Sequence, residues 1–115
     1  MTPTLHGIKA CDTMKKARAW LDSHGVAYRF HDYKTAGIDA ETLRGWAAKA
    51  GWETLLNRAG TTFRKLPEAQ KTDLDEARAI ALMLAQPSMI KRPVLTLGDE
   101  IVVGFKPEVY ARHFA

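Results

Sequence analysis

The chain has 115 residues, of which 46% are hydrophobic and 26% are charged, a composition typical of one folded domain and unlike that of a disordered segment. It contains no apolar run of about eighteen residues and no basic N-terminal segment followed by a long apolar stretch. We therefore expect no membrane span, no signal peptide, no membrane partner and a cytoplasmic location. The net charge of +4 favours anionic partners, but the basic residues are scattered without an aromatic ladder, so nucleic-acid binding is not expected.

The chain contains one cysteine, Cys11. A single cysteine cannot form an internal disulfide, so any disulfide chemistry must use a sulfur atom of another molecule. The histidines do not have the spacing of metal ligands relative to Cys11, so no metal site is predicted. These histidines are His6, His24, His31 and His113.

Cys11 is predicted to stand where a strand gives way to a helix. Residues Thr4 to Ile8 form a short apolar run typical of a buried strand, and from Met14 onward apolar residues recur at helical spacing. At the start of a helix, unpaired backbone N–H groups and the positive end of the helix dipole favour a thiolate over a thiol. This placement predicts a nucleophilic cysteine, and the alternative is a small buried apolar residue.

Charged residues surround the start of that helix. Lys15, Lys16 and Arg18 lie in its first turns, where cations oppose the helix dipole but can attract an anion or steady a thiolate. Asp12 is expected to raise the thiol pKa, and to cap the helix together with Thr13. The alternative for the basic residues is a solvated helix face.

A second strand is predicted from Val26 to Tyr33, after the helix stops at Gly25. Strand, helix and strand within about thirty residues form a βαβ unit with parallel strands and a right-handed crossover. This unit places Cys11 at the carboxyl end of the first strand, the edge at which open α/β sheets bind ligands. His31 alternates outward on the second strand and is predicted to be a surface residue.

The middle of the chain has the pattern of several short helices. Lys34 to Gly37 is predicted to be a turn, and Asp39 is predicted to cap a helix over Ala40 to Ala50. A further short helix is predicted to begin at Trp52, and its phase places both Trp46 and Trp52 in the core.

A polar stretch from Asn57 to Lys65 interrupts this helical pattern. It contains Arg58 and Arg64 together with two threonines and a glycine. Such a loop can present guanidinium and hydroxyl groups to an anion. The alternative is an exposed polar connection.

Two more helical stretches are predicted before the end of this block. One begins near Pro67, and Thr72 with Asp75 resembles the capping box of the next, which ends near Gln86. The predicted buried side of that last helix consists of Leu74, Ala77, Ile80, Ala81 and Leu84.

The last third of the chain changes to the pattern of strands. Pro93 to Leu97 and Ile101 to Phe105 are predicted to form an antiparallel hairpin, and a final helix follows Pro107. The order β-α-β, helical block, β-β-α is that of the α/β thioredoxin-like fold with a mixed four-stranded sheet. We therefore predict a single thioredoxin-like domain over residues 1–115, with a helical insertion over approximately residues 39–86.

Four ordered segments of the chain carry a likeness to a known family. They are His6 to Lys16, Phe30 to Tyr33, Leu55 to Leu66 and Pro87 to Val94. On these segments the chain resembles the ArsC/Spx family, most closely its YffB-like branch, over essentially the whole length. In the arsenate reductases of this family a single cysteine attacks the oxyanion, arginines bind it, and glutathione with glutaredoxin completes the reduction. The resemblance therefore implies that Cys11 is the nucleophile and that Arg92 binds the anion.

The resemblance also implies the backbone geometry around Arg92. It implies a cis peptide between Arg92 and Pro93 that faces Cys11. It further implies that backbone groups of Ile90 to Arg92 turn toward the sulfur, where they could pair with a bound peptide such as glutathione.

The chain departs from the arsenate reductases at several positions. Those enzymes have glycine where Asp12 stands, an arginine where Lys15 stands and an arginine near Asn57. Asp12 would repel arsenate, and Asn57 removes a guanidinium unless Arg58 or Arg64 substitutes for it, so efficient arsenate reduction is not expected. Spx-type regulators usually carry a two-cysteine redox switch, which a chain with one cysteine lacks.

The main hypothesis from the sequence is an oxidoreductase, a glutathione-dependent thiol reductase in which Cys11 is the single nucleophile of a monothiol mechanism. We expect glutathione as co-substrate, no tightly bound cofactor, glutaredoxin as a candidate partner, and a monomer. The residues predicted to bind the glutathione carboxylates or the departing charge are Lys9, Lys15, Arg58, Arg64, Arg92 and Pro93. The alternatives are an arsenate reductase of the glutathione/glutaredoxin-linked type and a non-catalytic Spx-like regulator or protein-interaction module.

Overall fold

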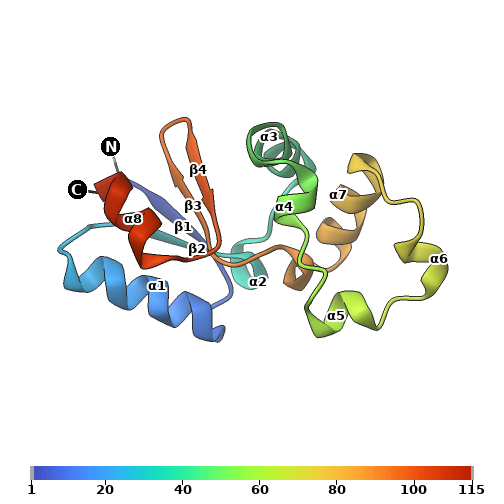
Figure 1. Ribbon diagram of the computed structural model, residues 1–115, viewed down its shortest axis with the longest axis horizontal. Coiled ribbons are helices and arrows are strands. Elements are labelled where there is room, and N and C mark those ends of the chain that lie inside the picture. The colour runs from blue at the N-terminus through green and yellow to red at the C-terminus, as the bar shows by residue number, and fades with distance from the viewer. Residues whose placement is uncertain (1, 115) are drawn as a thin grey trace. The chain divides into compact units, whose positions relative to one another are not determined.

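The computed structural model describes residues 2–114 (Figure 1). The chain divides into two compact units, the first made of residues 1–36 and 92–115 and the second of residues 37–91. The predicted insertion of approximately residues 39–86 falls within the bounds of the second unit. A single domain over the whole chain stays a prediction. In the part of the chain that the structure describes, no helix has the length and apolar character needed to cross a membrane.

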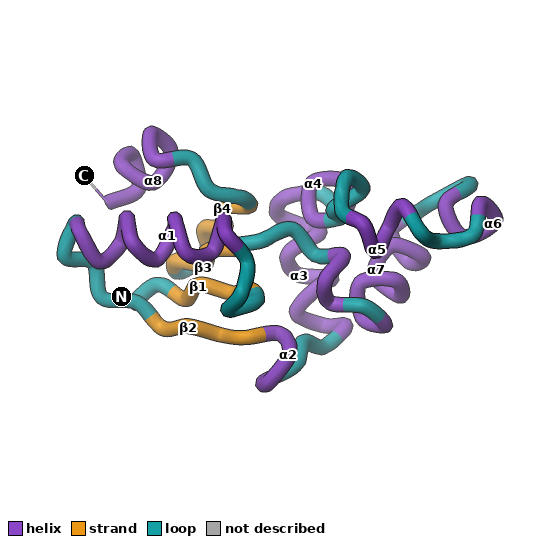
Figure 2. The backbone as a smooth tube through the Cα atoms, turned by 90° about the horizontal axis from the view of Figure 1, so that it is seen from below, coloured by secondary structure: helices purple, strands orange, loops and turns teal. Residues whose placement is uncertain are grey.

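The first unit is built on a four-stranded sheet. Its strands are β1 (Thr4–Gly7), β2 (Arg29–Asp32), β3 (Val94–Leu97) and β4 (Glu100–Val103), in the spatial order β2-β1-β3-β4 (Figure 2). β1 runs parallel to β2 and antiparallel to β3, and β3 runs antiparallel to β4. The helices of this unit are α1 (Asp12–Ser23), α2 (Tyr33–Ala36) and α8 (Pro107–Phe114). The predicted α/β fold with a mixed four-stranded sheet is confirmed.

One face of α1 forms the core of the first unit. Met14, Ala17 and Leu21 follow one another at spacings of three and four residues, which places them on one side of the helix. All three side chains have 0% exposure. They pack in one cluster with Leu5 of β1, Leu95 of β3 and Tyr110 of α8. Burial of one leucine side chain contributes about 1.5 to 3 kcal/mol, so this cluster fixes α1 against the sheet.

The second strand ends earlier than predicted. β2 stops at Asp32 and Tyr33 begins α2, so the prediction of a turn over Lys34 to Gly37 is wrong for its helical residues. The cause is local, because the Asp32 carboxylate accepts the N–H of Lys34 at 2.8 Å and caps the short helix. His31 is half-buried instead of exposed, because it is paired with His6 of β1 and the two ring centroids lie 5.2 Å apart.

The second unit consists of short helices. They are α3 (Ala40–Ala50), α4 (Trp52–Leu55), α5 (Thr61–Arg64), α6 (Glu68–Lys71) and α7 (Glu76–Ala85), followed by the 3₁₀ turn η1 (Pro87–Met89). α3 is capped as predicted, since the Asp39 carboxylate accepts the N–H of Thr42 at 2.7 Å. An isolated antiparallel bridge joins Leu56 to Ile90. Large side chains buried in this unit include Leu43, Leu55, Leu56, Met83, Met89 and Ile90.

The start of α7 differs from the predicted capping box. Thr72 ends α6, and Asp75 caps α7 by accepting the N–H of Arg78 at 2.8 Å. The polar stretch Asn57 to Lys65 also contains one turn of helix, α5, in place of an unbroken loop. Both differences involve a helix of four residues, α6 in the first case and α5 in the second, and side-chain periodicity gives little information for so short a helix.

The buried residues of the second unit also differ in part from the prediction. Ala77 and Ala81 are exposed, because an alanine side chain buries too little area to fix the phase of a helix. Trp46 is buried as predicted, but Trp52 is only half-buried. The buried residues of α7 are Ala79, Ile80 and Met83.

Candidate active site

Cys11 is the N-cap residue of α1. Its backbone is extended (φ −78°, ψ 132°), its N–H donates to the Ile8 carbonyl at 3.2 Å, and its carbonyl accepts the N–H of Lys15 at 3.1 Å. These bonds close the turn after β1 and open the first turn of the helix. The predicted cap by Asp12 and Thr13 is wrong, because these are the first two helical residues. The half-buried thiol stands at the carboxyl end of β1, as predicted.

The Cys11 thiol is shifted toward the thiolate. Burial raises its pKa, but the backbone N–H of Met14, the guanidinium of Arg92 and the backbone N–H of Thr13 together hold the pKa below the ordinary thiol value. The sulfur does not cap the helix through a hydrogen bond. The N–H groups at the start of α1 and the positive charge of Arg92 instead favour the thiolate electrostatically. Asp12 is not among the groups that shift this pKa, contrary to the prediction. The arrangement favours a nucleophilic sulfur.

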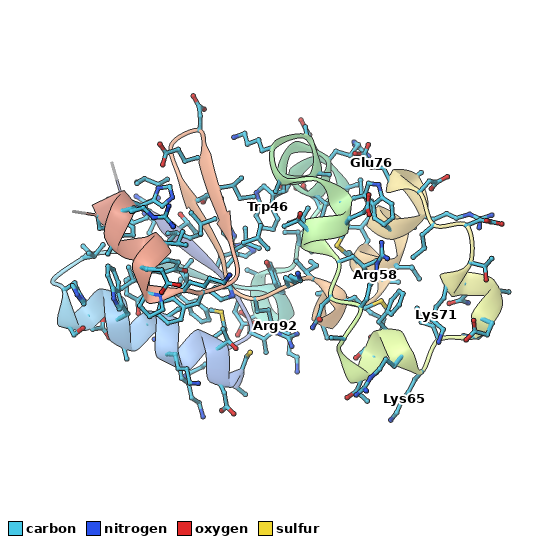
Figure 3. All side chains as sticks on the ribbon, in the orientation of Figure 1. Trp46, Arg58, Lys65, Lys71, Glu76 and Arg92 are labelled. Atoms are coloured by element: carbon cyan, nitrogen blue, oxygen red, sulfur yellow. The ribbon has the colours of Figure 1, made fainter. Side chains whose placement is uncertain are left out.

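Arg92 comes from the segment that leads into β3. The Arg92–Pro93 peptide is cis, as the resemblance implies. Pro93 is buried, and its carbonyl accepts the N–H of Gly104 at 2.8 Å. The side chain of Arg92 is half-buried (Figure 3), and its hydrogen-bonding groups and its positive charge both lower the pKa of the Cys11 thiol. The first unit therefore brings together Cys11 and Arg92, with Pro93 beside them in the chain.

Two backbone donors of this segment are already engaged. The N–H of Ile90 donates to the Pro87 carbonyl at 3.0 Å, and the N–H of Lys91 donates to the Leu55 carbonyl at 2.8 Å. The prediction that backbone groups of Ile90 to Arg92 pair with a bound peptide is therefore wrong for these two donors.

The basic residues of the first unit differ in what they contact. Lys9 lies exposed in the turn before the thiol, and Lys15 lies exposed one helical turn after it. Arg18 is instead engaged inside the unit: its Nε donates to the Tyr28 hydroxyl at 3.1 Å, and its guanidinium lies 4.8 Å from the centroid of the Phe30 ring. The two lysines are thus the better placed of these cations for an anion at the thiol.

The other two predicted arginines belong to the second unit. Arg58 follows α4 (Figure 3), and its guanidinium lies 5.4 Å from the centroid of the Trp52 ring and 3.9 Å from the Glu53 carboxylate. Arg64 is exposed at the end of α5. Their joint action with Cys11 on one substrate stays a prediction.

The second unit also contains a hollow that the sequence did not indicate. It has a volume of about 350 Å³ and is lined by Glu53, Leu56, Asn57, Arg58, Ala59 and Lys91. Sequence reasoning singled out Arg58 for binding but neither Glu53 nor Lys91. Lys91 reaches this place through the bridge of Leu56 with Ile90, a non-local pairing that no local sequence pattern reveals.

The histidines of the described part of the chain form no recognisable metal site. Among residues 2–114, no group of three or more His, Cys, Asp or Glu side chains is arranged to hold a metal ion. Burial and the neighbouring His31 lower the pKa of His6 to about 4. His6 is therefore neutral at pH 7 and contributes no positive charge to the first unit.

The comparisons with known proteins agree with this geometry. The model of the ArsC family matches residues 6–113. A solved structure described as the YffB protein is 73% identical, with a TM-score of 0.96, and the match covers 99% of this chain and 100% of the other. A solved arsenate reductase (ArsC) related protein from Brucella melitensis is 60% identical, with a TM-score of 0.81 and coverage of 99% and 95%. The global transcriptional regulator Spx of Streptococcus mutans is 26% identical over 91% of this chain and 77% of its own length. The chain thus belongs to the ArsC family and has its thioredoxin-like fold.

Proposed function

We propose that this ArsC-family protein is an oxidoreductase that reduces disulfides with glutathione, and that Cys11 is its nucleophile. The observation that carries the proposal is the state of Cys11, a half-buried thiol at the start of α1 whose pKa lies below the ordinary value. Thiol–disulfide exchange begins with attack by a thiolate, so a cysteine in this state is suited to it. The similarity to an arsenate reductase related protein supports the oxidoreductase class.

The reaction takes two exchange steps and needs one sulfur atom of the protein. For a substrate disulfide between a thiol RSH and glutathione, the Cys11 thiolate attacks the glutathione sulfur, a Cys11–glutathione disulfide forms, and RS⁻ leaves and takes up a proton. The thiolate of a second glutathione attacks the glutathione sulfur of that disulfide and releases oxidised glutathione and the Cys11 thiolate. The proton lost by the second glutathione balances the proton gained by RS⁻, and glutathione supplies the two electrons.

Positive side chains are the proposed partners of the glutathione carboxylates. We assign this binding to Lys9, Lys15, Arg58, Arg64 and Arg92, with Pro93 holding the segment of Arg92. The proposal includes no tightly bound cofactor. We propose that the protein is a monomer and acts in the cytoplasm, where glutathione keeps thiols reduced. Glutaredoxin is the proposed partner that removes glutathione from Cys11.

The proposal is tested by the pH dependence of Cys11 alkylation with iodoacetamide, and by the mass of the chain after exposure to oxidised glutathione. We expect an apparent pKa clearly below about 8.5, one glutathione added per chain, and turnover of a glutathionylated peptide when glutathione is supplied. An apparent pKa at or above that value, with no glutathione adduct, would exclude the thiol reductase.

An arsenate reductase is the second candidate, because one relative is described as an arsenate reductase (ArsC) related protein. The exposed carboxylate of Asp12, next to Cys11, opposes it by repelling an oxyanion. Rates with arsenate and with a glutathionylated peptide, measured under the same conditions, separate the two. We expect the peptide to be the better substrate, and a higher rate with arsenate would reverse the order of the candidates.

A regulator that binds a protein partner is the third candidate, because Spx of Streptococcus mutans is a relative. Cys11→Ser separates it from the enzymes, since a binding role does not need the sulfur. We expect cells with this variant to behave like cells that lack the protein. Behaviour like that of the wild type would favour the regulator.

A further inference from the structure

The hollow in the second unit carries charges of both signs. The Glu53 carboxylate, the Arg58 guanidinium and the Lys91 ammonium belong to its lining. Glu53 and Arg58 are only loosely paired, since their closest N–O distance is 3.9 Å and the two side chains retain 74% and 49% of their exposure. An exposed pair of this kind contributes little to folding, so both charges can serve a ligand.

Arg58 is held at the hollow by an aromatic ring. Its guanidinium lies 5.4 Å from the centroid of the Trp52 ring, within the range of a cation–π contact. Trp52 is half-buried, and the guanidinium of Arg58 covers part of its ring. An arginine restrained in this way loses less conformational entropy when it binds a ligand.

Asn57 is positioned by the absence of a side chain at Gly60. A Cβ atom added at Gly60 would lie 2.9 Å from Asn57 Nδ2, so a side chain at position 60 would displace this amide from its place in the lining. The two sides of the hollow are tied by the backbone. The N–H of Asn57 donates to the Met89 carbonyl at 2.7 Å, and the N–H of Lys91 donates to the Leu55 carbonyl at 2.8 Å. The polar lining is therefore held by the fold on both sides.

We propose that this hollow binds a zwitterionic α-amino acid group, and that its ligand is the γ-glutamyl end of glutathione. Such a group carries a carboxylate and an ammonium on one carbon atom. The carboxylate accepts from Arg58 and Lys91, and the ammonium donates to Glu53. A lining of positive charges alone would suit a simple anion, so the acidic Glu53 selects for the amino acid. The inference rests on the proposed use of glutathione.

The size of the hollow agrees with one end of a tripeptide. Small-molecule sites range from about 300 to about 1,000 Å³, and the hollow, at about 350 Å³, lies near the lower limit. It suits the γ-glutamyl group better than the whole of glutathione.

The experiment uses S-methylglutathione, which has no thiol and cannot react with Cys11. Its affinity for the full chain is compared by calorimetry with that of the glutaryl analogue, which lacks only the ammonium, and of S-methylcysteinylglycine, which lacks the γ-glutamyl group. We expect Glu53→Gln to weaken the binding of S-methylglutathione about three- to fivefold and to leave the affinity for the glutaryl analogue unchanged. Arg58→Ala should weaken the binding of S-methylglutathione and of the glutaryl analogue by about tenfold. Neither variant should change the affinity for S-methylcysteinylglycine.

Matched controls come from α3 of the same unit. Glu41→Gln and Arg44→Ala remove exposed charges that do not line the hollow, and they should leave all affinities unchanged. Wild-type affinity for S-methylglutathione in both Glu53→Gln and Arg58→Ala would overturn the inference. Free glutamate that binds as tightly as S-methylglutathione, with the same dependence on Glu53, would overturn the assignment to glutathione.

The two proposals fail in different ways. If the wild type turns over a glutathionylated peptide while changes at the hollow have no effect on binding, the hollow is excluded and the reductase stands. If the wild type forms no glutathione adduct at Cys11 and shows no turnover, the reductase is excluded, and the glutathione assignment of the hollow falls with it.

Discussion

The two units of the chain differ in how they are held together. The first unit pairs strands from both ends of the sequence and buries one continuous apolar cluster under α1 and α8. The second unit consists of helices of 4 to 11 residues, stabilised by caps such as Asp39 and Asp75 and by one isolated bridge.

The units also differ in the chemistry they contain. The groups that lower the pKa of Cys11 are Thr13, Met14 and Arg92, all in the first unit. The hollow and Arg58 belong to the second unit. The two proposals assign activation of the sulfur to the first unit and binding of the γ-glutamyl group to the second. Changes in the first unit should therefore alter the reactivity of the thiol, and changes at the hollow should alter the affinity for S-methylglutathione.

The largest expected effect is that of Cys11→Ser. Serine lacks the acidity and nucleophilicity of the thiol, so reduction of a glutathionylated peptide should fall by at least about a thousandfold. Binding of S-methylglutathione should change little if recognition belongs to the second unit. Turnover and calorimetry on the same preparation measure both. Loss of both binding and turnover would contradict the assignment of ligand recognition to the second unit.

The next largest effect is on folding. Leu21→Ala in the first unit and Leu43→Ala in the second each remove a side chain with 0% exposure, and each should lower the free energy of unfolding by about 2 to 5 kcal/mol. Chemical denaturation followed by circular dichroism measures the change. Lys16→Ala, at an exposed position of α1, is the control and should be nearly neutral. A loss below about 1 kcal/mol for Leu21→Ala would contradict the core described for the first unit.

A smaller effect is expected for Arg92→Gln. Burial raises the pKa of Cys11 and the guanidinium lowers it. Without the guanidinium the pKa should therefore rise, and alkylation at pH 7 should slow by about threefold or more. Rates with iodoacetamide over a pH series measure the change. Arg112→Gln on α8 and Arg58→Ala in the second unit are the controls, and both should keep the wild-type profile. An altered profile in Arg58→Ala would place an activating group outside the first unit.

The smallest effect is a pH dependence at the cap of α3. Hydrogen bonds from the side chain and backbone of Thr42 lower the pKa of Asp39. Its ionised form therefore stabilises the folded chain above the unfolded-state pKa of about 3.9, and this contribution is lost as the pH falls through the lower folded value. The melting temperature of Asp39→Asn should lie slightly below that of the wild type at pH 6, and the gap should close toward pH 3. A gap independent of pH would show that the charge is not involved.

The sequence predicted the first unit better than the second, for a physical reason. The spacing of Met14, Ala17 and Leu21 fixes both the helix and its buried face, and the position of Cys11 follows from the boundary between strand and helix. The hairpin follows from two β-rich runs around a short turn. These signals are strong because the side chains are large and the pattern is unbroken.

In the second unit the same reasoning holds for α3, whose bounds, Asp39 cap and buried Trp46 agree with the prediction, and for the start of α4 at Trp52. It fails for the other short helices and for the buried face of α7. A helix of four residues shows no period, and the alanines of α7 do not distinguish one face from another. The hollow depends on Lys91 and Leu56 coming together through a bridge between distant segments. A local sequence pattern cannot predict such a pairing. The helical phase also predicted that Trp52 is buried, but it could not reveal the contact of this ring with Arg58 at the surface.

The single thiol of the chain has a consequence for how the protein would respond to the redox state of the cell. A pair of cysteines that closes to a disulfide is reduced by two glutathione molecules, so its ratio of oxidised to reduced form follows the concentration of oxidised glutathione divided by the square of the glutathione concentration. Cys11 has no second cysteine in the chain to pair with, and it exchanges with one oxidised glutathione to release one reduced molecule. Its occupancy would therefore follow the simple ratio of the two forms, and dilution of the whole glutathione pool at constant ratio would leave it unchanged.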